Sequence, residues 1–134
     1  METHRHSLNT IGTQIVASAI EVHRTLGGPG LLESLYEEAL AWELDKAGYA
    51  VQRQVALPAV YKGFVLQGSL RLDLLINDSV IVECKATTEY KPVFQSQVLT
   101  YLRLSGLKLG YLINFGERFV SKGIHRIVNG SIDE

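Results

Sequence analysis

Apolar side chains recur every three or four residues in the first third of the chain, a spacing that predicts helices. In the first predicted helix, residues 8–26, the inward positions are Leu8, Ile11, Ile15, Ala19, Val22 and Leu26. Gly27-Gly28-Pro29-Gly30 ends this helix, because glycine and proline favour turns. A second helix is expected from about Leu31 to Ala47, with Gly48 as its C-cap.

The pattern changes to a period of two after residue 50. Residues 51–57 alternate as a half-exposed strand does, and Pro58 is expected to end that strand. A further strand segment, with a turn or bulge at Gly63, is expected within residues 60–66. Two dense apolar runs, 70–76 and 80–86, flank Asn77-Asp78-Ser79, and this arrangement predicts a hairpin.

The last third of the chain predicts one helix and further strand. Pro92 suits the first position of a helix that runs to about Ser105 and ends at Gly106. Residues 109–115 form a predicted strand, and residues 123–128 are a candidate for a last one. The order ααββββαβ(β) indicates an α/β (α+β) domain, with a central mixed sheet flanked by helices.

Composition narrows the class of protein. The chain has 134 residues, which favours a single domain over 1–134, with residues 1–7 expected to be a mobile N-terminus. There are 13 Lys+Arg against 14 Asp+Glu, for a net charge of −1. The domain as a whole is therefore not a basic nucleic-acid binder, and any phosphate site is local or takes positive charge from a metal ion.

The cysteine count and the absence of long apolar runs bear on the compartment. Cys84 is the one cysteine, so an intrachain disulfide and a cysteine zinc cage are both excluded. A reducing, cytoplasmic setting is expected, and no apolar run approaches the roughly 20 residues that span a membrane.

Charged residues interrupt the two apolar runs of the predicted hairpin. Asp73, Glu83 and Lys85 are costly within buried strands unless they are paired, hydrogen-bonded or metal-bound. If Asn77-Asp78-Ser79 is a three-residue loop, Ile76 pairs with Val80. Strand alternation then places Asp73 opposite Glu83, with Arg71 and Lys85 on the same face and Cys84 pointing the other way.

Two carboxylates a few ångströms apart both stay ionised at pH 7 only if a cation sits between them. Oxygen ligands from aspartate and glutamate suit Mg²⁺ or Mn²⁺. The alternative is a cross-strand ion-pair network, in which Arg71 and Lys85 neutralise Asp73 and Glu83. The metal site is favoured, because both strands otherwise have the composition of buried ones.

Two motifs carry a family resemblance. Asp73, followed by Glu83-Cys84-Lys85 on the next strand, resembles the D…E-x-K signature of the PD-(D/E)XK nuclease superfamily. The segment Gly30-Leu31-Leu32-Glu33-Ser34-Leu35-Tyr36 resembles the G-x-x-E-x-x-Y motif of the GxxExxY protein family, a small branch of that superfamily. The resemblance covers about residues 11–128 and implies a restriction-endonuclease-like core.

The resemblance implies a role for each motif residue. Asp73 and Glu83 would bind Mg²⁺ or Mn²⁺, the backbone carbonyl of Cys84 would add a ligand, and Lys85 would position or activate the hydrolytic water. Glu33 would complete the metal site. The alternative for Glu33 is helix position N3 after Gly30 as N-cap, where it would form a capping box or complement the helix dipole, and both alternatives stay open.

A further pair lies on the third predicted helix. Gln97 and Tyr101 are four residues apart, share one helix face and resemble the Q-x-x-x-Y element of RecB-type nucleases. That element supports the catalytic lysine and contacts nucleic acid. The alternative is that Tyr101 packs in the core, while Gln97 caps the helix or bonds to a sheet edge.

The expected function is a divalent-metal-dependent nuclease that hydrolyses phosphodiester bonds, with DNA favoured over RNA as its partner. A homodimer or a protein partner is left open. The alternative is a nuclease-fold adaptor or binding subunit without catalytic activity, which the small size and near-neutral charge favour.

Overall fold

The structure is a computed structural model that describes residues 7–132. The elements follow one another along the chain as α1 (Leu8–Thr25), α2 (Glu33–Lys46), β1 (Val51–Tyr61), β2 (Phe64–Ile76), β3 (Val80–Lys85), α3 (Val93–Ser105), β4 (Leu109–Asn114), a short 3₁₀ turn η2 (Val120–Gly123) and β5 (Ile124–Val128). Within residues 7–132, the search for a helix that is both long and apolar enough to cross a membrane finds none.

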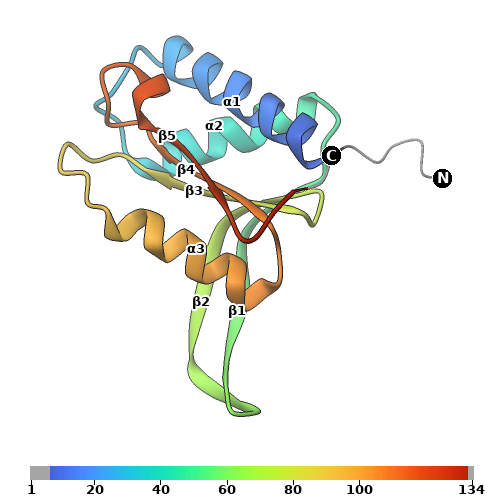
Figure 1. Cartoon of the computed structure of the whole chain (residues 1–134). Helices are drawn as coiled ribbons and strands as arrows, with labels where there is room; N and C mark the ends of the chain where they lie inside the picture. Colours follow the sequence, from blue (N-terminus) through green and yellow to red (C-terminus); the bar gives the residue numbers. More distant parts are fainter. Residues whose placement is uncertain (1–6, 133–134) are drawn as a thin grey trace.

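The strands form one mixed sheet in the order β1-β2-β3-β4-β5. β3 and β4 are parallel, and the other neighbours are antiparallel. A parallel pair needs a crossover connection, and α3 provides it. α1 and α2 cover one face of the sheet and α3 the other (Figure 1). The predicted α+β fold with a central mixed sheet is confirmed.

A separate apolar core lies on each face of the sheet. The core under α1 and α2 includes Ile15, Leu40 and Leu74, which are fully buried. The core under α3 includes Ile81 and Leu102, also fully buried. The central strand β3 contributes side chains to both cores, so its composition is apolar on both faces apart from Glu83 and Lys85.

The number of strands before α3 differs from the prediction. Three strands replace the predicted four, because β1 continues through Pro58 to Tyr61 and residues 60–66 form the end of one long hairpin. β1 is an edge strand, which tolerates proline since one side of its backbone has no strand partner. Lys62 and Gly63 both have positive φ, as a tight two-residue hairpin turn requires.

The start of α1 bears on the expected mobile N-terminus. Ser7 is the N-cap of α1, and its hydroxyl accepts a hydrogen bond from the Thr10 backbone N–H at 3.0 Å. Ser7 is therefore tied to the helix, and residues 1–6 of the expected segment lie outside the described residues.

Candidate functional site

The site is built on the β2–β3 hairpin, whose predicted register is confirmed. Ile76 pairs with Val80 and Leu74 with Val82, across the loop that the prediction assigned. Asn77 and Asp78 in that loop both adopt positive φ, which these two residue types tolerate better than most. The paired register ends at Leu74 and Val82, just before the two acidic positions.

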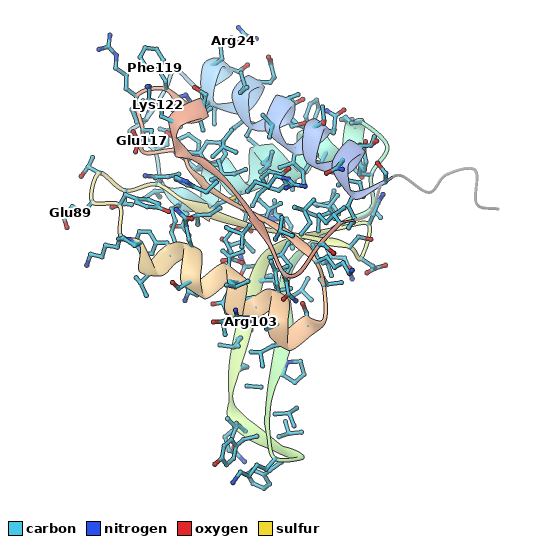
Figure 2. The ribbon with its side chains drawn as sticks, in the orientation of Figure 1. Arg24, Glu89, Arg103, Glu117, Phe119 and Lys122 are labelled. Carbon is cyan, nitrogen blue, oxygen red and sulfur yellow. The ribbon has the colours of Figure 1, made fainter. Side chains whose placement is uncertain are left out.

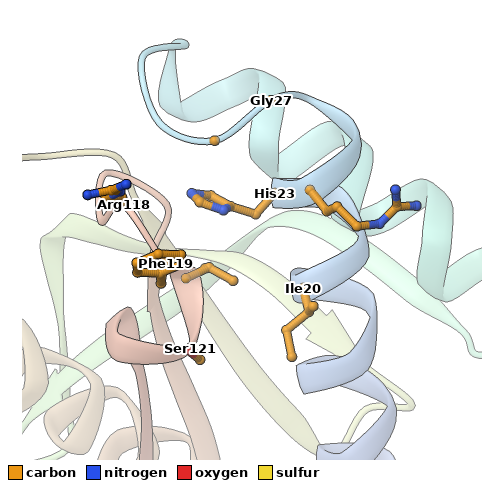
Figure 3. Close-up of a pocket in the computed structure, with 9 residues that line it drawn as sticks. Ile20, His23, Gly27, Arg118, Phe119 and Ser121 are labelled. Atoms are coloured by element: carbon orange, nitrogen blue, oxygen red, sulfur yellow. The ribbon is translucent and has the colours of Figure 1, made fainter.

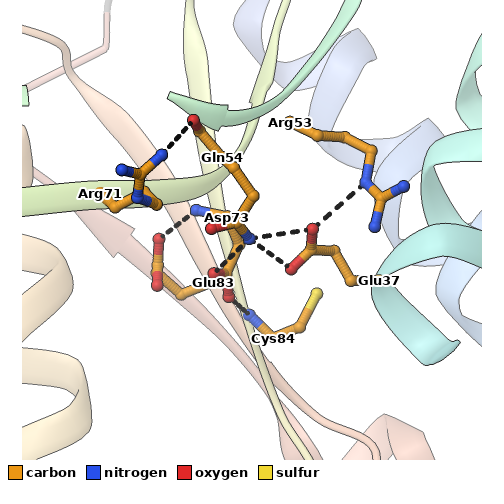
Figure 4. A network of polar contacts seen from close by, with 7 residues as sticks. All are labelled: Glu37, Arg53, Gln54, Arg71, Asp73, Glu83 and Cys84. Atoms are coloured by element: carbon orange, nitrogen blue, oxygen red, sulfur yellow. Dashed lines mark hydrogen bonds and ion pairs between the residues drawn. The ribbon is translucent and has the colours of Figure 1, made fainter. Parts of the chain in front are cut away.

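Beyond that point, the side chains of Asp73 and Glu83 bond to the backbone of the opposite strand (Figure 4). The Asp73 N–H donates to Glu83 Oε2 at 2.9 Å, and the Cys84 N–H donates to Asp73 Oδ2 at 2.9 Å. The carboxylates thus take the place of backbone carbonyls in the ladder. Each acidic side chain is held by the strand that carries the other, so the two are positioned as a pair.

Burial makes this pair electrostatically costly. Glu83 is only 6% exposed, and its burial, followed by the negative charge of Asp73, raises the pKa of Glu83 to about 8. The positive charge of Lys85 opposes this rise. Glu83 is therefore largely protonated at pH 7 when no cation is bound, as the sequence argument required of two close carboxylates.

The donor set fits a hard divalent cation. Carboxylate oxygens of Asp73 and Glu83 are ligands that Mg²⁺ prefers, and one or two carboxylates completed by water form a usual magnesium site. A positive ion would also relieve the charge repulsion that raises the pKa of Glu83. Within residues 7–132, no three His, Cys, Asp or Glu side chains gather as a ready metal-binding group.

Cys84 lies between Glu83 and Lys85 in sequence, but its thiol points to the opposite face. Its side chain is fully buried in the core under α1 and α2, as predicted. Burial raises the pKa of the Cys84 thiol well above its ordinary value. The thiol is thus a small apolar group there, and only its backbone faces the carboxylate pair.

Glu33 lies at the first position of α2, where it faces the charges of the site. Its side chain is exposed, yet partial burial of the carboxyl group and then the charge of Asp73 raise its pKa, while Lys85 lowers it. The capping-box alternative is wrong, because the N-cap is Leu32 and not Gly30. Glu33 is therefore not at N3, although it still lies at the positive end of the helix dipole.

Tyr36 explains why α2 begins where it does. Its hydroxyl donates to the Gly28 carbonyl at 2.7 Å and accepts from the Leu31 N–H at 3.2 Å. Its fully buried ring stacks on Phe115 with centroids 4.7 Å apart. These bonds hold residues 28–31 as a loop, in which Gly30 has a φ of 119°, so the helix cannot start earlier. The tyrosine of the G-x-x-E-x-x-Y motif thus positions the glutamate.

Lys85 and Tyr101 lie on the α3 side of the sheet with Glu83. Lys85 Nζ lies 4.8 Å from the centroid of the Phe94 ring, a cation–π distance that directs the ammonium group toward α3. Tyr101 is 7% exposed within the core under α3, and burial, then the charges of Glu83 and Asp73, raise its pKa. Tyr101 therefore packs in the core, as the alternative interpretation predicted, and it also lies close to the carboxylates of Glu83 and Asp73.

Gln97 does not join this group. It is exposed on α3, and its side chain makes no hydrogen bond within the part of the chain that the structure describes. The suggested cap or sheet-edge bond is therefore absent there. Gln95 makes such bonds instead, to Tyr90 Oη at 2.6 Å and to His125 Nδ1 at 3.3 Å.

Three residues of the site were missed in the sequence. Glu37 is 4% exposed and accepts hydrogen bonds from Arg53 Nε at 3.2 Å and from Gln54 Nε2 at 3.0 Å (Figure 4). Gln54 Nε2 also lies 3.4 Å from Asp73 Oδ1, so it links helix α2 to the carboxylate pair. One signal was available: Glu37 lies at helical spacing from the buried Leu40, Ala41 and Leu44.

The ion-pair alternative predicted a different network from the one observed. Arg71 donates to the backbone carbonyl of Gln54 at 3.1 Å, and within residues 7–132 neither Arg71 nor Lys85 forms a salt bridge with Asp73 or Glu83. The observed ion pair is instead that of the exposed Arg53 with the buried Glu37. Among the described residues, the carboxylate pair thus has no cationic side chain in direct contact.

The expected alternation of faces fails near Asp73. Leu72 packs in the core under α3, but Leu74, two residues later, packs in the core under α1 and α2. Opposite them on β1, Gln54 has a φ of +54°, a left-handed conformation that reverses the strand's faces. Strand alternation from Leu74 therefore does not place Arg71 on the face of Glu83 and Lys85, as was predicted.

A cavity of about 460 Å³ lies between the end of α1 and the loop before η2 (Figure 3). None of the predicted site residues lines it. Its lining residues are Ile20, His23, Arg24, Gly27, Gly28, Arg118, Phe119, Val120 and Ser121. Figure 2 shows Arg24, Phe119 and Lys122 together at this end of the molecule. The cavity is a separate feature with an aromatic and basic lining.

Comparison with known families agrees with this geometry. The sequence pattern of the PD-(D/E)XK nuclease superfamily matches residues 9–127. The chain belongs to the PD-(D/E)XK nuclease superfamily, and its mixed sheet and three helices form the restriction-endonuclease-like fold of that superfamily. Searches of curated proteins and of solved structures return no match to the chain.

Proposed function

We propose that this chain is a nuclease of the GxxExxY family that hydrolyses phosphodiester bonds with the help of a divalent metal ion, and that its substrate is DNA in preference to RNA. The observation that carries the proposal is the paired arrangement of Asp73 and Glu83, each bonded to the backbone of the other's strand. Nuclease activity agrees with the superfamily. The GxxExxY assignment rests on Gly30, Glu33 and Tyr36.

The proposed metal ion is Mg²⁺ or Mn²⁺. Asp73, Glu83 and the backbone carbonyl of Cys84 would hold it, and Glu33 at the start of α2 would add a further carboxylate. A bound divalent ion supplies Lewis acidity and lowers the pKa of water, which phosphodiester hydrolysis requires. Glu37 and Gln54 act as positioning residues, because Gln54 links the Glu37 carboxylate to Asp73.

Lys85 is the proposed catalytic cation. Its ammonium group would orient the attacking water or neutralise charge that develops on the phosphate. The Phe94 ring, 4.8 Å away, restricts the orientation of the ammonium. Tyr101 would position the carboxylates from the α3 side, and the exposed Gln97 is available for contact with nucleic acid.

Substrate binding is expected to be weak and sensitive to salt. The net charge of −1 leaves little general attraction to DNA. Local cations near the cavity, Arg24 and Arg118, are candidates for phosphate contact. The homodimer considered as a way to enlarge the binding surface also stays a proposal, as does a cytoplasmic setting inferred from the single buried cysteine.

The test is cleavage of supercoiled and linear DNA by purified protein with Mg²⁺ or Mn²⁺. Asp73→Asn and Lys85→Ala should each lower the rate by roughly 100-fold or more, as removal of a charge-stabilising group does. Asparagine keeps an oxygen to accept the Cys84 N–H, so the fold is preserved. Asp78→Asn and Lys122→Ala, at exposed positions, are matched controls that should cleave at the wild-type rate. Equal rates for wild type and Asp73→Asn would contradict the proposal.

The adaptor alternative makes the opposite prediction in calorimetry. Its supporting observation is that no three acidic, histidine or cysteine side chains in residues 7–132 gather as a metal-binding group. Titration of Mg²⁺ or Mn²⁺ into folded wild type should give heat that Asp73→Asn and Glu83→Gln abolish. Absence of such binding, together with absence of cleavage, favours the adaptor.

A further inference from the structure

The far end of the β1–β2 hairpin stands clear of the rest of the molecule (Figure 1). Every residue from 60 to 69 is exposed. The apolar side chains among them are between 43% and 66% exposed, and they are Val60, Tyr61, Phe64, Val65 and Leu66, which we call the hairpin patch. Figure 2 shows that the side chains at this end of the hairpin project away from the rest of the molecule. Contiguous exposed apolar groups of this size mark an interaction surface.

The backbone of the hairpin end is also incompletely paired. β3 pairs with β2 only over Leu74–Ile76, and β1 is the outermost strand of the sheet. Residues 64–69 of β2 therefore have β1 as their one strand neighbour within the described chain. α3 packs against the hairpin base at Leu57 and Leu70, but not against the hairpin patch. A free two-stranded ribbon is marginally stable in water, so a further strand would stabilise it.

The low charge of the hairpin end indicates which kind of partner would bind it. Between Pro58 and Ser69 the hairpin has a single charged residue, Lys62 at the turn. A nucleic-acid interface needs several cations to neutralise phosphates, so DNA does not fit this surface. An apolar protein surface with an open strand edge does fit it, and the hairpin of a second copy has both properties.

We propose that two copies of this chain associate through their hairpins, with β2 of one copy pairing antiparallel to β2 of the other around a two-fold axis. Such a symmetric pairing brings the β2 part of the hairpin patch, Phe64, Val65 and Leu66, from both copies together. Pairing of the two β2 edges would join the hairpins into one four-stranded sheet, in which Phe64, Val65 and Leu66 of each copy lie beside β2 side chains of the other copy on the same face. Backbone hydrogen bonds between the two β2 edges add to this.

The sequence of the two edges favours β2 over β1. Pro58 removes an N–H from β1, whereas residues 64–69 of β2 contain no proline. Antiparallel pairing also puts the two Lys62 side chains at opposite ends of the interface, so like charges do not meet. This association does not depend on the nuclease activity proposed above.

The experiment is measurement of mass by sedimentation equilibrium over micromolar to millimolar protein. Wild type should reach twice the monomer mass, and Phe64→Asp and Leu66→Lys should each weaken the dimer at least 100-fold. Trp42→Asp is the matched control, since Trp42 is 58% exposed on α2, far in sequence from the hairpin, and this variant should dimerise like wild type. Circular dichroism and thermal unfolding check that each variant is folded.

Cross-linking tests the strand pairing itself. Cys84 is fully buried, so Gln67→Cys supplies an accessible thiol near the middle of the exposed edge of β2. Under mild oxidation it should form a disulfide-linked dimer at least tenfold faster than Ser96→Cys on α3, which is also exposed. Equal rates would overturn the β2 pairing.

Three results would overturn the proposed dimer. The first is a wild-type monomer throughout the concentration range, and the second is a dimer that Trp42→Asp dissociates but Phe64→Asp does not. The third is a monomer whose hairpin patch binds instead to phosphatidylcholine vesicles or to DNA, with Phe64→Asp abolishing that binding.

Discussion

The two ends of strand β2 reverse the usual distribution of polar and apolar residues. The end at Asp73 lies beside buried strands, yet it carries a charged side chain that bonds to the backbone of β3. The other end, at Phe64–Leu66, lies in solvent, yet its side chains are apolar. Both arrangements are unfavourable for the chain alone, because a buried charge and an exposed apolar surface each raise its free energy. In the proposals above, one end binds a cation and the other end binds a second copy of the chain.

The largest contrast between the two ends should appear when the same residue type is truncated in each. Leu74 is fully buried beside the carboxylate pair. Leu74→Ala should lower the free energy of unfolding by about 2–5 kcal/mol, because it removes buried methyl groups and leaves a cavity. Urea unfolding followed by circular dichroism measures this. A loss below about 1 kcal/mol would show that this end of β2 is less tightly packed than its burial indicates.

A pH-dependent stability should be confined to the buried end. The folded-state pKa of Glu83 is raised from 4.5 to about 8, so between these values the folded protein holds a proton that the unfolded chain releases. In metal-free wild type, the stability should therefore fall as the pH rises from about 4.5 through about 8. Glu83→Gln removes this loss and keeps an acceptor for the Asp73 N–H.

The melting temperature of Glu83→Gln should accordingly exceed that of wild type by roughly 10 °C or more at pH 9, and the two should converge near pH 4. Glu89→Gln, at an exposed position, is the control and should melt as wild type at every pH. Parallel curves for wild type and Glu83→Gln would show that Glu83 is ionised and paired in the folded protein.

Gln54 lies at the point on β1 where the alternation of side chains between the two faces of the sheet reverses. Because its φ is +54°, a side chain at this position is strained and glycine is not. Gln54→Gly should therefore be more stable than Gln54→Ala by about 1 kcal/mol, the reverse of the usual order in a strand. Both variants lose the side-chain hydrogen bonds to Glu37 and Asp73. The difference between their urea midpoints therefore reports only the effect of the backbone conformation at residue 54. Greater stability of the alanine variant would refute the left-handed conformation.

The smallest effect on the free energy of unfolding is expected at the exposed end of β2. Leu66→Ala should change the free energy of unfolding of the dilute monomer by less than about 0.5 kcal/mol, because Leu66 has no core contacts to lose. The same substitution should weaken the dimer measured by sedimentation. A loss as large as that of Leu74→Ala would mean that the hairpin end packs on the body of its own chain.

Some of the site could be predicted because its determinants are close in sequence. The loop Asn77-Asp78-Ser79 sets the register of β2 and β3, and that register brings Asp73 to Glu83. Glu37, Arg53 and Gln54 could not be found in the same way. Their contacts join α2 to β1 across 16 and 17 residues, and Gln54 reaches Asp73 across 19. The reversal of faces at Gln54 has no signal in the hydropathy pattern, since Val51, Val55 and Leu57 keep the same alternation on both sides of it.

The sequence by itself determined the class of fold, the β2–β3 hairpin and the placement of Asp73, Glu83 and Lys85 on it, because periodicity, turn chemistry and register are local properties of the chain. Tertiary structure decided which carboxylates are buried, that Tyr36 holds the loop before Glu33, and that Gln97 faces solvent. It also decided that β1 continues past Pro58 into a projecting hairpin. These outcomes depend on which surfaces meet when distant segments pack, and burial and pKa follow from that packing.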